Sequence, residues 1–179
     1  MRRLFPLLLL LLSFNSFSQN STGVSKNQFS INFLMPALEL ETRLTNNSTI
    51  DLYLGTGFAL VSGDAYGGTE FGFFPTFTAQ YRNYYNLEKR LSKNRNISNN
   101  NGNYLAFHSA IFGGNPIIGE LESTANYAIE VGPVWGLQRV YNGGFKLNLN
   151  LGLGYGFNDQ GDSAFGPLVG FQLGWLISN

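Results

Sequence analysis

Apolar and polar residues alternate one by one over much of the chain, which is the pattern of a β-strand with two different faces. The clearest case covers residues 146–157, where every second position from Leu147 to Phe157 is a leucine or an aromatic residue. The positions between them hold Lys146, two asparagines and three glycines. Successive strand residues point to opposite faces, so this segment predicts a strand with one apolar and one small polar face.

The same alternation recurs in seven further segments, and no segment beyond residue 18 carries a sustained helical period. These segments cover residues 29–34, 38–44, 50–60, 71–82, 104–112, 126–139 and 165–178. A tight reversal at residues 35–37 separates the first two of them. Eight strands joined in sequence predict an all-β fold, an eight-stranded antiparallel up-and-down transmembrane β-barrel over residues 28–179.

The connections between these strands alternate between the two ends of the expected barrel. Bacterial single-chain barrels have an even number of strands, with both termini on the periplasmic side. The connections expected in the periplasm are residues 45–48, 86–101 and 141–144. Those expected outside the cell are residues 62–70, 113–125 and 158–164.

Three prolines, Pro75, Pro133 and Pro167, lie inside the predicted strands. Proline lacks the N–H that a β-ladder needs, and in sheets it is confined to edges and bulges. We therefore expect these residues at bulges or at the rim of the barrel.

The first residues have the three-part layout of a secretory signal peptide. A methionine and two arginines precede an apolar stretch, residues 4–12, and a small polar segment ends at Ser18. The apolar stretch is too short for a retained membrane-spanning helix. We expect residues 1–18 to be a cleaved signal peptide, residues 19–27 to be a linker, and the mature protein to be located in the outer membrane.

The composition narrows the possible classes of protein. The chain contains no cysteine, which excludes a lipid-modified N-terminal cysteine, a disulfide framework and a thiolate metal site. Charged residues make up 12% of the sequence, about half of their share in an ordinary soluble protein. Without the two arginines of the signal segment, nine basic and eleven acidic residues remain. A nucleic-acid partner, which needs a basic surface, is excluded.

An exported soluble barrel of the lipocalin type has the same period, with its apolar face turned inward around a ligand. The polar faces of this sequence favour the opposite orientation, because they hold small residues instead of the lysine and glutamate that coat a soluble protein. Aromatic residues also gather near strand ends on the apolar face, as in the two girdles of a barrel in lipid. The expected girdle comprises Tyr81, Tyr85, Tyr127, Trp135, Tyr155 and Trp175.

Two regions of the sequence resemble a known family. The first contains residues 80–87, Gln-Tyr-Arg-Asn-Tyr-Tyr-Asn-Leu, a basic continuation at residues 89–95, and Asn-Gly-Asn-Tyr-Leu at residues 101–105. The second is the set of glycine-rich alternating strands at the C-terminus. On these motifs the chain resembles the short outer-membrane β-barrel proteins of Gram-negative bacteria of the bacteroides group. The resemblance implies an outer-membrane barrel and is silent about activity.

Several charged residues lie on the polar faces of the predicted strands and are expected to meet inside the barrel. A short turn at residues 46–48 places Arg43 opposite Asp51 across two strands. Buried charges need partners whatever the protein does, so the favoured interpretation is an ion-paired plug that fills the lumen. The alternative is a polar relay or a pair of catalytic carboxylates. The expected lumen polar cluster consists of Glu39, Glu41, Arg43, Asp51, Arg82, His108 and Glu130.

His108 is followed by Ser109, which invites comparison with barrel enzymes that modify lipid A. Adjacent strand residues point to opposite faces, so His108 is expected to face the lumen and Ser109 the lipid. A nucleophile and its base must lie within hydrogen-bond distance, so the two do not form a catalytic pair. We expect no catalytic residue, no cofactor and no metal site, because one histidine and no cysteine leave only carboxylates as further ligands.

A basic segment follows the predicted strand at residues 71–82. Its basic residues are Lys89, Arg90, Lys93 and Arg95. Leu87 and Leu91 have the spacing of one helical turn. As a periplasmic turn, the segment is either a solvated connection or a contact for anionic phospholipid headgroups or the cell wall. On the outside of the cell it would instead meet lipopolysaccharide phosphates.

These expectations give one leading function and two alternatives. The leading hypothesis is a non-enzymatic, monomeric outer-membrane barrel with a plugged polar lumen, which serves envelope integrity or surface interaction. Its expected partners are outer-membrane lipid and the barrel-assembly machinery. The alternatives are a lipid-modifying barrel enzyme and a conduit for small apolar molecules that opens sideways near Pro75 or Pro133. The fold class does not decide among them.

Overall fold

The computed structural model describes residues 23–63, 68–121 and 123–179. The expected signal peptide, residues 1–18, and residues 19–22 of the expected linker lie outside them. The described part of the chain is all-β, with one short α-helix, α2 (Leu87–Leu91), and two 3-10 turns, η2 (Ser98–Asn100) and η3 (Asn142–Gly144). Its strands are β1 (Asn27–Asn32), β2 (Ala37–Arg43), β3 (Ser48–Gly63), β4 (Gly68–Asn83), β5 (Gly102–Gly113), β6 (Ile118–Gly119), β7 (Tyr127–Val140), β8 (Phe145–Asn158) and β9 (Ser163–Ser178). None of the described helices is long and apolar enough to cross a membrane.

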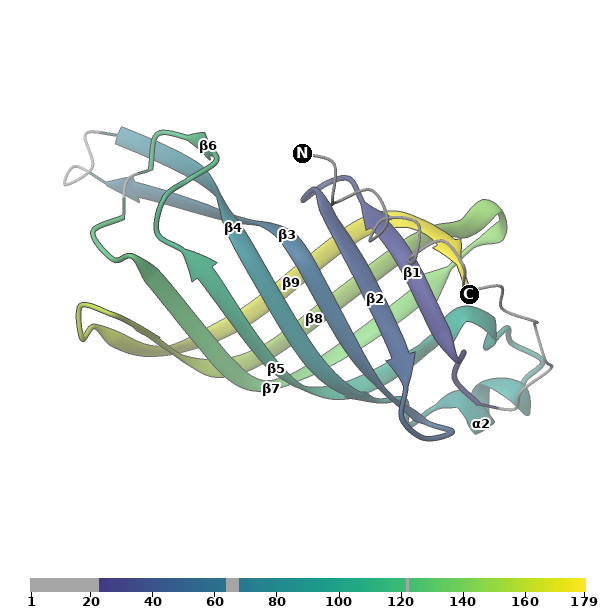
Figure 1. Ribbon diagram of the computed structural model, residues 1–179. Helices are drawn as coiled ribbons and strands as arrows, with labels where there is room; N and C mark the ends of the chain where they lie inside the picture. The colour runs from purple at the N-terminus through teal and green to yellow at the C-terminus, as the bar shows by residue number, and fades with distance from the viewer. Residues whose placement is uncertain (1–22, 64–67, 122) are drawn as a thin grey trace, which may run out of the picture.

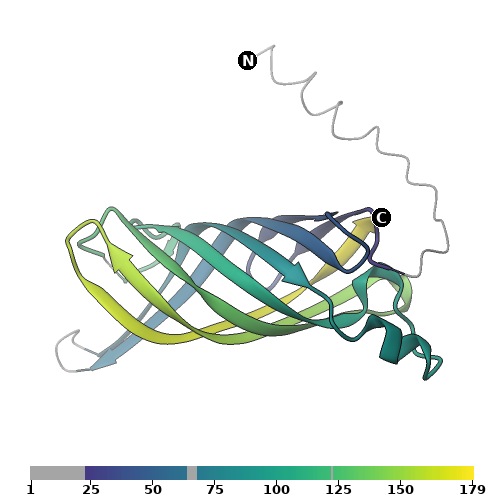
Figure 2. The same ribbon diagram turned by 90° about the horizontal axis from the view of Figure 1, so that it is seen from below.

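Eight of these strands form one antiparallel sheet that closes into a ring (Figure 1 and Figure 2). Each long strand pairs with the next one along the chain, and β9 pairs with β1 to complete the ring. The remaining strand, β6, has two residues and pairs with β4 at Gly72 and Phe73. The predicted all-β class, the eight strands and their up-and-down order are confirmed.

The two ends of the ring differ in what they carry. One end, referred to as the terminal end, holds the start of β1 and the end of β9, where Phe29 pairs with Ser178. The three connections expected in the periplasm, at residues 45–48, 86–101 and 141–144, lie together at this end, where the structure has them at residues 44–47, 84–101 and 141–144. The described parts of two connections expected outside, residues 114–121 with 123–126 and residues 159–162, lie at the opposite, distal end. Of the third, expected at residues 62–70, residues 64–67 lie outside the described part of the chain.

Alternate residues of each strand face the interior of the ring and its outer surface. On β8 the side chains of Lys146 and Asn148 are 1% and 0% exposed, whereas Leu151 and Leu153 are 58% and 54% exposed. Polar side chains therefore fill much of the interior, and aliphatic and aromatic side chains cover the outer surface. This is the reverse of a water-soluble protein, which does not expose large continuous apolar surfaces.

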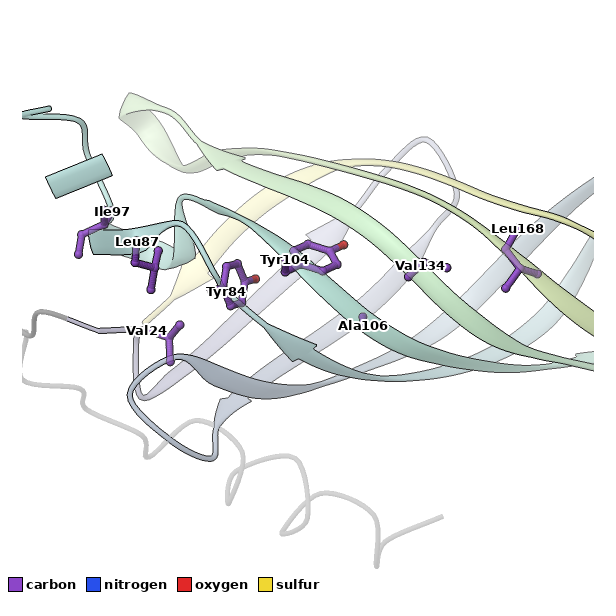
Figure 3. Packing of buried hydrophobic residues seen from close by; sticks show 8 residues of the cluster. All are labelled: Val24, Tyr84, Leu87, Ile97, Tyr104, Ala106, Val134 and Leu168. Carbon is purple, nitrogen blue, oxygen red and sulfur yellow. The ribbon is translucent and has the colours of Figure 1, made fainter. Parts of the chain in front are cut away.

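A small apolar cluster closes the terminal end and continues into the ring (Figure 3). Its members are Val24, Tyr84, Leu87, Ile97, Tyr104, Ala106, Val134 and Leu168. Val24 belongs to the segment before β1, is fully buried, and donates its backbone N–H to the Asn46 carbonyl at 2.9 Å. Val24 of the expected linker is thus packed into the closed end, whereas the Lys26 side chain is exposed.

The wall of the ring is incomplete beside the β1–β2 hairpin. β1 has 6 residues and β2 has 7, whereas their neighbours β9 and β3 have 16 each. The last pairings of the hairpin reach only Gly174 of β9 and Gly55 of β3. Residues 57–63 of β3 and 163–172 of β9 therefore pair only with β4 and β8. In Figure 1 the hairpin ends near the middle of its neighbours, and the interruption beyond it is referred to as the side gap.

The strand prolines lie where a neighbouring ladder is interrupted. The β4–β5 pairing begins at Thr76, so Pro75 lies just beyond the part of β4 that β5 covers. The pairing of β7 with β8 skips Pro133 and the residue before it. Pro167 lies on the part of β9 that borders the side gap. A missing N–H is tolerated at such positions, because one ladder there is already incomplete.

Candidate functional site

Arg82 is the centre of a polar network that fills the terminal half of the ring. Its Nη2 contacts Asp51 Oδ2 at 2.8 Å. Its Nη1 lies 3.8 Å from Oε1 of Glu39 and 3.8 Å from Oε1 of Glu41. The side chain is fully buried, and its guanidinium carbon lies 4.8 Å from the centre of the Tyr104 ring. One cation on β4 therefore joins carboxylates from β2 and β3.

Glu39 connects this network to β8 and β1. Lys146 Nζ donates to Glu39 Oε1 at 2.7 Å and to Ser30 Oγ at 3.4 Å. The second carboxylate oxygen of Glu39 accepts from Asn32 Nδ2 at 2.9 Å. Glu39 is thus hydrogen-bonded to Lys146 and to the strand that closes the ring, and it lies within ion-pair distance of Arg82.

Glu41 is held by hydroxyl and amide donors. Its Oε1 accepts from Thr49 Oγ1 at 2.7 Å and from Tyr84 OH at 2.8 Å. Its Oε2 accepts from Gln138 Nε2 at 3.0 Å. Gln138 Oε1 in turn accepts from Asn148 Nδ2 at 3.1 Å. These bonds extend the network to β7 and β8.

The network nearly balances its charge. Its three carboxylates and two cations have side chains that are at most 1% exposed. Each buried ion loses several kcal/mol of hydration free energy. The electrostatic attraction of a well-placed partner offsets about the same amount. Charge-assisted hydrogen bonds from neutral donors supply part of the compensation. The arrangement is therefore stable only when strands from all around the ring meet in one register.

The structure brings together four residues of the predicted lumen polar cluster, Glu39, Glu41, Asp51 and Arg82. The predicted pair of Arg43 with Asp51 is wrong, because Arg43 lies opposite Thr49. The β2–β3 turn covers residues 44–47, closed by bonds from Leu44 and Thr45 to the Ser48 carbonyl, so the register differs by two residues. Asp51 pairs with Arg82 from the next strand instead.

Sequence reasoning missed four large members of the network, Lys146, Gln138, Tyr84 and Tyr104. Lys146, Gln138 and Tyr104 stand on predicted polar faces, so their inward direction was available from the alternation. The contacts themselves cross the ring between strands that are distant in sequence. They depend on how the ring closes and on its register, which alternation does not specify.

His108 and Glu130 belong to a second polar group on the distal side of the network. His108 Nδ1 lies 2.9 Å from Gln80 Nε2, and His108 Nε2 lies 3.1 Å from Glu130 Oε1. Gln80 Oε1 also accepts from Arg82 Nε at 2.8 Å, which links the two groups. Both ring nitrogens of His108 therefore have partners, while Ser109 lies on the alternate, outer side of β5.

A cavity of about 290 Å³ lies next to this second group, in the distal half of the ring. The polar side chains of its lining are Tyr53, Thr56, Thr76, Thr78, Gln80, His108, Glu130, Asn150 and Gln172. Phe112 and Glu130 also line a second cavity of about 290 Å³ at the distal rim. The interior is thus filled in its terminal half and hollow in its distal half. The lining includes Pro167, which borders the side gap, and neither Pro75 nor Pro133, the two positions that the conduit alternative names.

The six predicted girdle residues all lie on the outer surface, each between 40% and 53% exposed. Tyr127 begins β7 and Tyr155 pairs with Phe165, so both lie towards the distal end. Tyr81, Tyr85 and Trp175 lie towards the terminal end, and Trp135 lies nearer the middle of β7, opposite Leu151. Trp135 reaches the terminal group through its indole, whose Nε1 donates to Tyr85 OH at 2.8 Å. The outer surface therefore carries amphipathic rings near both ends of its aliphatic middle.

The basic segment is attached to the closed terminal end. Residues 87–91 form α2, which confirms the single helical turn, and Leu87 is buried. Arg90 Nη2 donates to the Asn96 carbonyl at 2.9 Å. The other three basic residues, Lys89, Lys93 and Arg95, are exposed. Their charges are thus presented to the surroundings of the terminal end.

Asp159 joins two distal connections. Its Oδ1 accepts from the backbone N–H of Asn126 at 2.9 Å, and its Oδ2 accepts from Asn126 Nδ2 at 2.6 Å. These hydrogen bonds lower the pKa of Asp159, because they favour the charged carboxylate. The contact is therefore complete above the ordinary pKa of an aspartate and is lost as the pH falls through the lowered value.

The candidate site gives no indication of a metal centre. In the described part of the chain, no group of three or more histidine, cysteine, aspartate or glutamate residues could hold a metal ion. No protein-family model, curated protein or solved structure matches the chain. The function therefore has to be inferred from the geometry of the ring and its interior.

The Arg82→Met variant tests whether the network stabilises the fold. It leaves three buried carboxylates with one cation, so the free energy of unfolding should fall by about 3–5 kcal/mol. The Arg82→Met/Asp51→Asn double variant should be more stable than the single variant, because one unpaired carboxylate is gone. Urea titration of the refolded protein measures both. Lys93→Met, a change at an exposed residue, is the control, and its stability should stay within about 0.5 kcal/mol of the wild type. Equal stability of Arg82→Met and Lys93→Met would contradict the stabilising role of the Arg82 network.

Proposed function

We propose that the chain is an exported outer-membrane protein and that its ring is an eight-stranded transmembrane β-barrel. The observation that carries the proposal is the inverted polarity of the ring. Leu151 and Val169 on the outer face are 58% and 73% exposed, whereas Arg82 and Glu39 inside are 0% and 1% exposed. Apolar surface exposed to water costs about 25 cal/mol of free energy per Å², and the same surface in hydrocarbon carries no comparable cost. Where the sheet is closed, its backbone groups are also paired within the bilayer.

The dimensions of the strands support this proposal. Six of the eight ring strands have 12 to 16 residues, and a tilted transmembrane strand needs about 9–11. In such a barrel the exposed aromatic residues near the two ends would lie at the two membrane interfaces, as in known barrels. A lipocalin-like barrel would instead need these rings turned towards an apolar interior.

The filled interior favours a non-conducting, non-enzymatic role. The Arg82 network occupies the terminal half of the ring, and Val24, Leu87 and Ile97 pack beneath it. An ion would have to displace both layers to pass. The protein then acts through its distal half and its distal connections, in surface interaction or in the integrity of the envelope.

A lipid-modifying enzyme is the second candidate, favoured by the His108–Glu130 pair beside the cavity. A nucleophile must lie within hydrogen-bond distance of its base. Ser109 belongs to the outer side of the strand, and the Thr76 hydroxyl donates to the Phe74 carbonyl at 3.0 Å. The pair is better described as one end of a hydrogen-bonded chain through Gln80, so we favour binding over catalysis.

The proposed orientation has both termini and the basic segment in the periplasm. Lys89, Lys93 and Arg95 would then contact anionic headgroups of the inner leaflet or the cell wall. The barrel-assembly machinery would insert the chain, and a monomer is sufficient because the ring is closed. With the opposite orientation, the basic segment would meet lipopolysaccharide phosphates at the surface.

Cysteine labelling tests location and orientation together. Glu120→Cys, in a distal connection, should react with an impermeant maleimide on intact cells, and Lys93→Cys should react only after the outer membrane is opened. Both residues are exposed, and the wild-type chain lacks cysteine, so the background is clean. Labelling of Lys93→Cys but not Glu120→Cys on intact cells would reverse the orientation. Labelling of neither variant after lysis of the outer membrane would contradict the location.

Planar-bilayer recording tests the closed interior. The refolded wild-type protein should insert without producing steady conductance steps, because charged and apolar layers fill the terminal half. Insertion in the same sample is checked by resistance of the barrel to protease added to the vesicles. Reproducible ionic steps from inserted protein would show an open pathway and contradict the plugged lumen.

A further inference from the structure

The cavity beside the Arg82 network opens sideways through the side gap. On β9 its lining includes Leu168 from the inner face and also Val169 from the outer face. On β3 it likewise includes both Gly57 and Phe58. Such a run of neighbouring residues lines one cavity where the cavity reaches the edge of the strand. The side gap provides such edges on β3 and on β9, because the hairpin between them is too short to cover them.

In the proposed barrel the side gap lies within the distal half of the bilayer. The 7 residues of β2 rise about 3.3 Å each and are tilted by about 45°, so they cover roughly half of a hydrocarbon core of about 30 Å. Free N–H and C=O groups of a sheet edge are costly in hydrocarbon and are tolerated where they line a polar cavity. The gap is therefore a place where bilayer lipid and a polar interior meet directly.

The lining of the cavity selects the chemistry of a ligand. Its deep wall carries hydrogen-bonding side chains such as Thr78, Gln80 and His108, whereas Val169 and Phe171 border the gap. No lysine or arginine belongs to the lining, and Glu130 is its single carboxylate, so an anionic head is disfavoured. The volume of about 290 Å³ is at the lower limit of ligand pockets, about 300 Å³, which favours one chain over two.

We propose that the cavity binds a single-chain amphiphile with an uncharged, hydroxyl-bearing head, of the monoacylglycerol type. The head lies against Thr78, Gln80 and His108, and the acyl chain leaves through the side gap into the distal half of the bilayer. This inference rests on the proposed function, because only a bilayer surrounds the gap with apolar solvent. The side gap is then the entrance of a lipid-binding site.

Photolabelling in vesicles tests the proposal. The refolded protein is reconstituted into phosphatidylcholine vesicles that contain a monoacylglycerol with a diazirine next to its glycerol head, and labelled residues are mapped by mass spectrometry. Label is expected on the interior residues Thr78 and Phe112, in addition to outer residues at the rims. Excess unlabelled monoacylglycerol should suppress the interior label and leave the rim label unchanged. Label confined to the rims, or interior label that does not compete, would overturn the proposal.

Two matched variants separate the cavity from general lipid contact. A Cβ at Gly57 would lie 2.7 Å from Thr76 Oγ1 and 2.9 Å from Phe112 Cε1, so Gly57→Phe fills the cavity. Its interior label should fall about tenfold, equivalent to about 1.4 kcal/mol of binding. Gly166→Phe makes the same change on β9, where a Cβ meets nothing within 4 Å, and should label like the wild type. Equal interior label in both variants would overturn the assigned site.

Different labelling results would contradict the preference for an uncharged head and the proposed transmembrane barrel. A fatty acid and a lysophosphatidylcholine with the same chain and diazirine should label the interior at least several-fold less than the monoacylglycerol. Equal interior labelling by all three would overturn the preference for an uncharged head. A protein that recovers with the vesicles but carries label neither inside nor on its rims would contradict the transmembrane barrel itself.

Discussion

Closure of the sheet between β1 and β9 is the constraint on which the rest of the structure depends. The two strands pair over four positions, from Phe29 with Ser178 to Asn32 with Gly174. A Cβ at Gly174 would lie 2.5 Å from the Ile31 carbonyl oxygen, so a glycine is needed for this close approach. Once the ring is closed, each strand side chain faces either a small enclosed interior or the outer surface, and the two alternate along the strand.

The enclosed interior explains the distribution of charge. Arg82 on β4 and Lys146 on β8 meet the carboxylates of Glu39, Glu41 and Asp51 where water has little access. Each ion is tolerable only because the others are fixed nearby. The short hairpin that completes the closure then has a second effect. It stops halfway along its neighbours, so the filled terminal half gives way to a distal cavity with an open side.

Much of this fold could be predicted from the sequence, because the alternation within one strand shows which residues share a face. It contains no information about which residues of the neighbouring strands lie opposite them. The inward direction of Glu39, Arg82 and His108 followed from the alternation alone. The pairing of Arg43 with Asp51 did not, because a turn placed two residues away changes every cross-strand partner. The contact of Lys146 with Glu39 joins residues 107 positions apart and depends on closure of the ring. The side gap depends on where the first hairpin turns relative to its long neighbours, which alternation alone does not determine.

The central claim is that the outer surface of the ring faces hydrocarbon. Its most direct test compares how much stability an introduced arginine costs at two depths in the bilayer. Leu151 lies in the middle of β8 and Phe165 near the distal end of β9, and they are 58% and 71% exposed. In lipid vesicles Leu151→Arg should lower the free energy of unfolding by about 2–4 kcal/mol, and Phe165→Arg by about 0–1 kcal/mol. Exposed positions in water would instead tolerate both changes within about 0.5 kcal/mol. Equal, negligible losses at the two positions would contradict the transmembrane barrel.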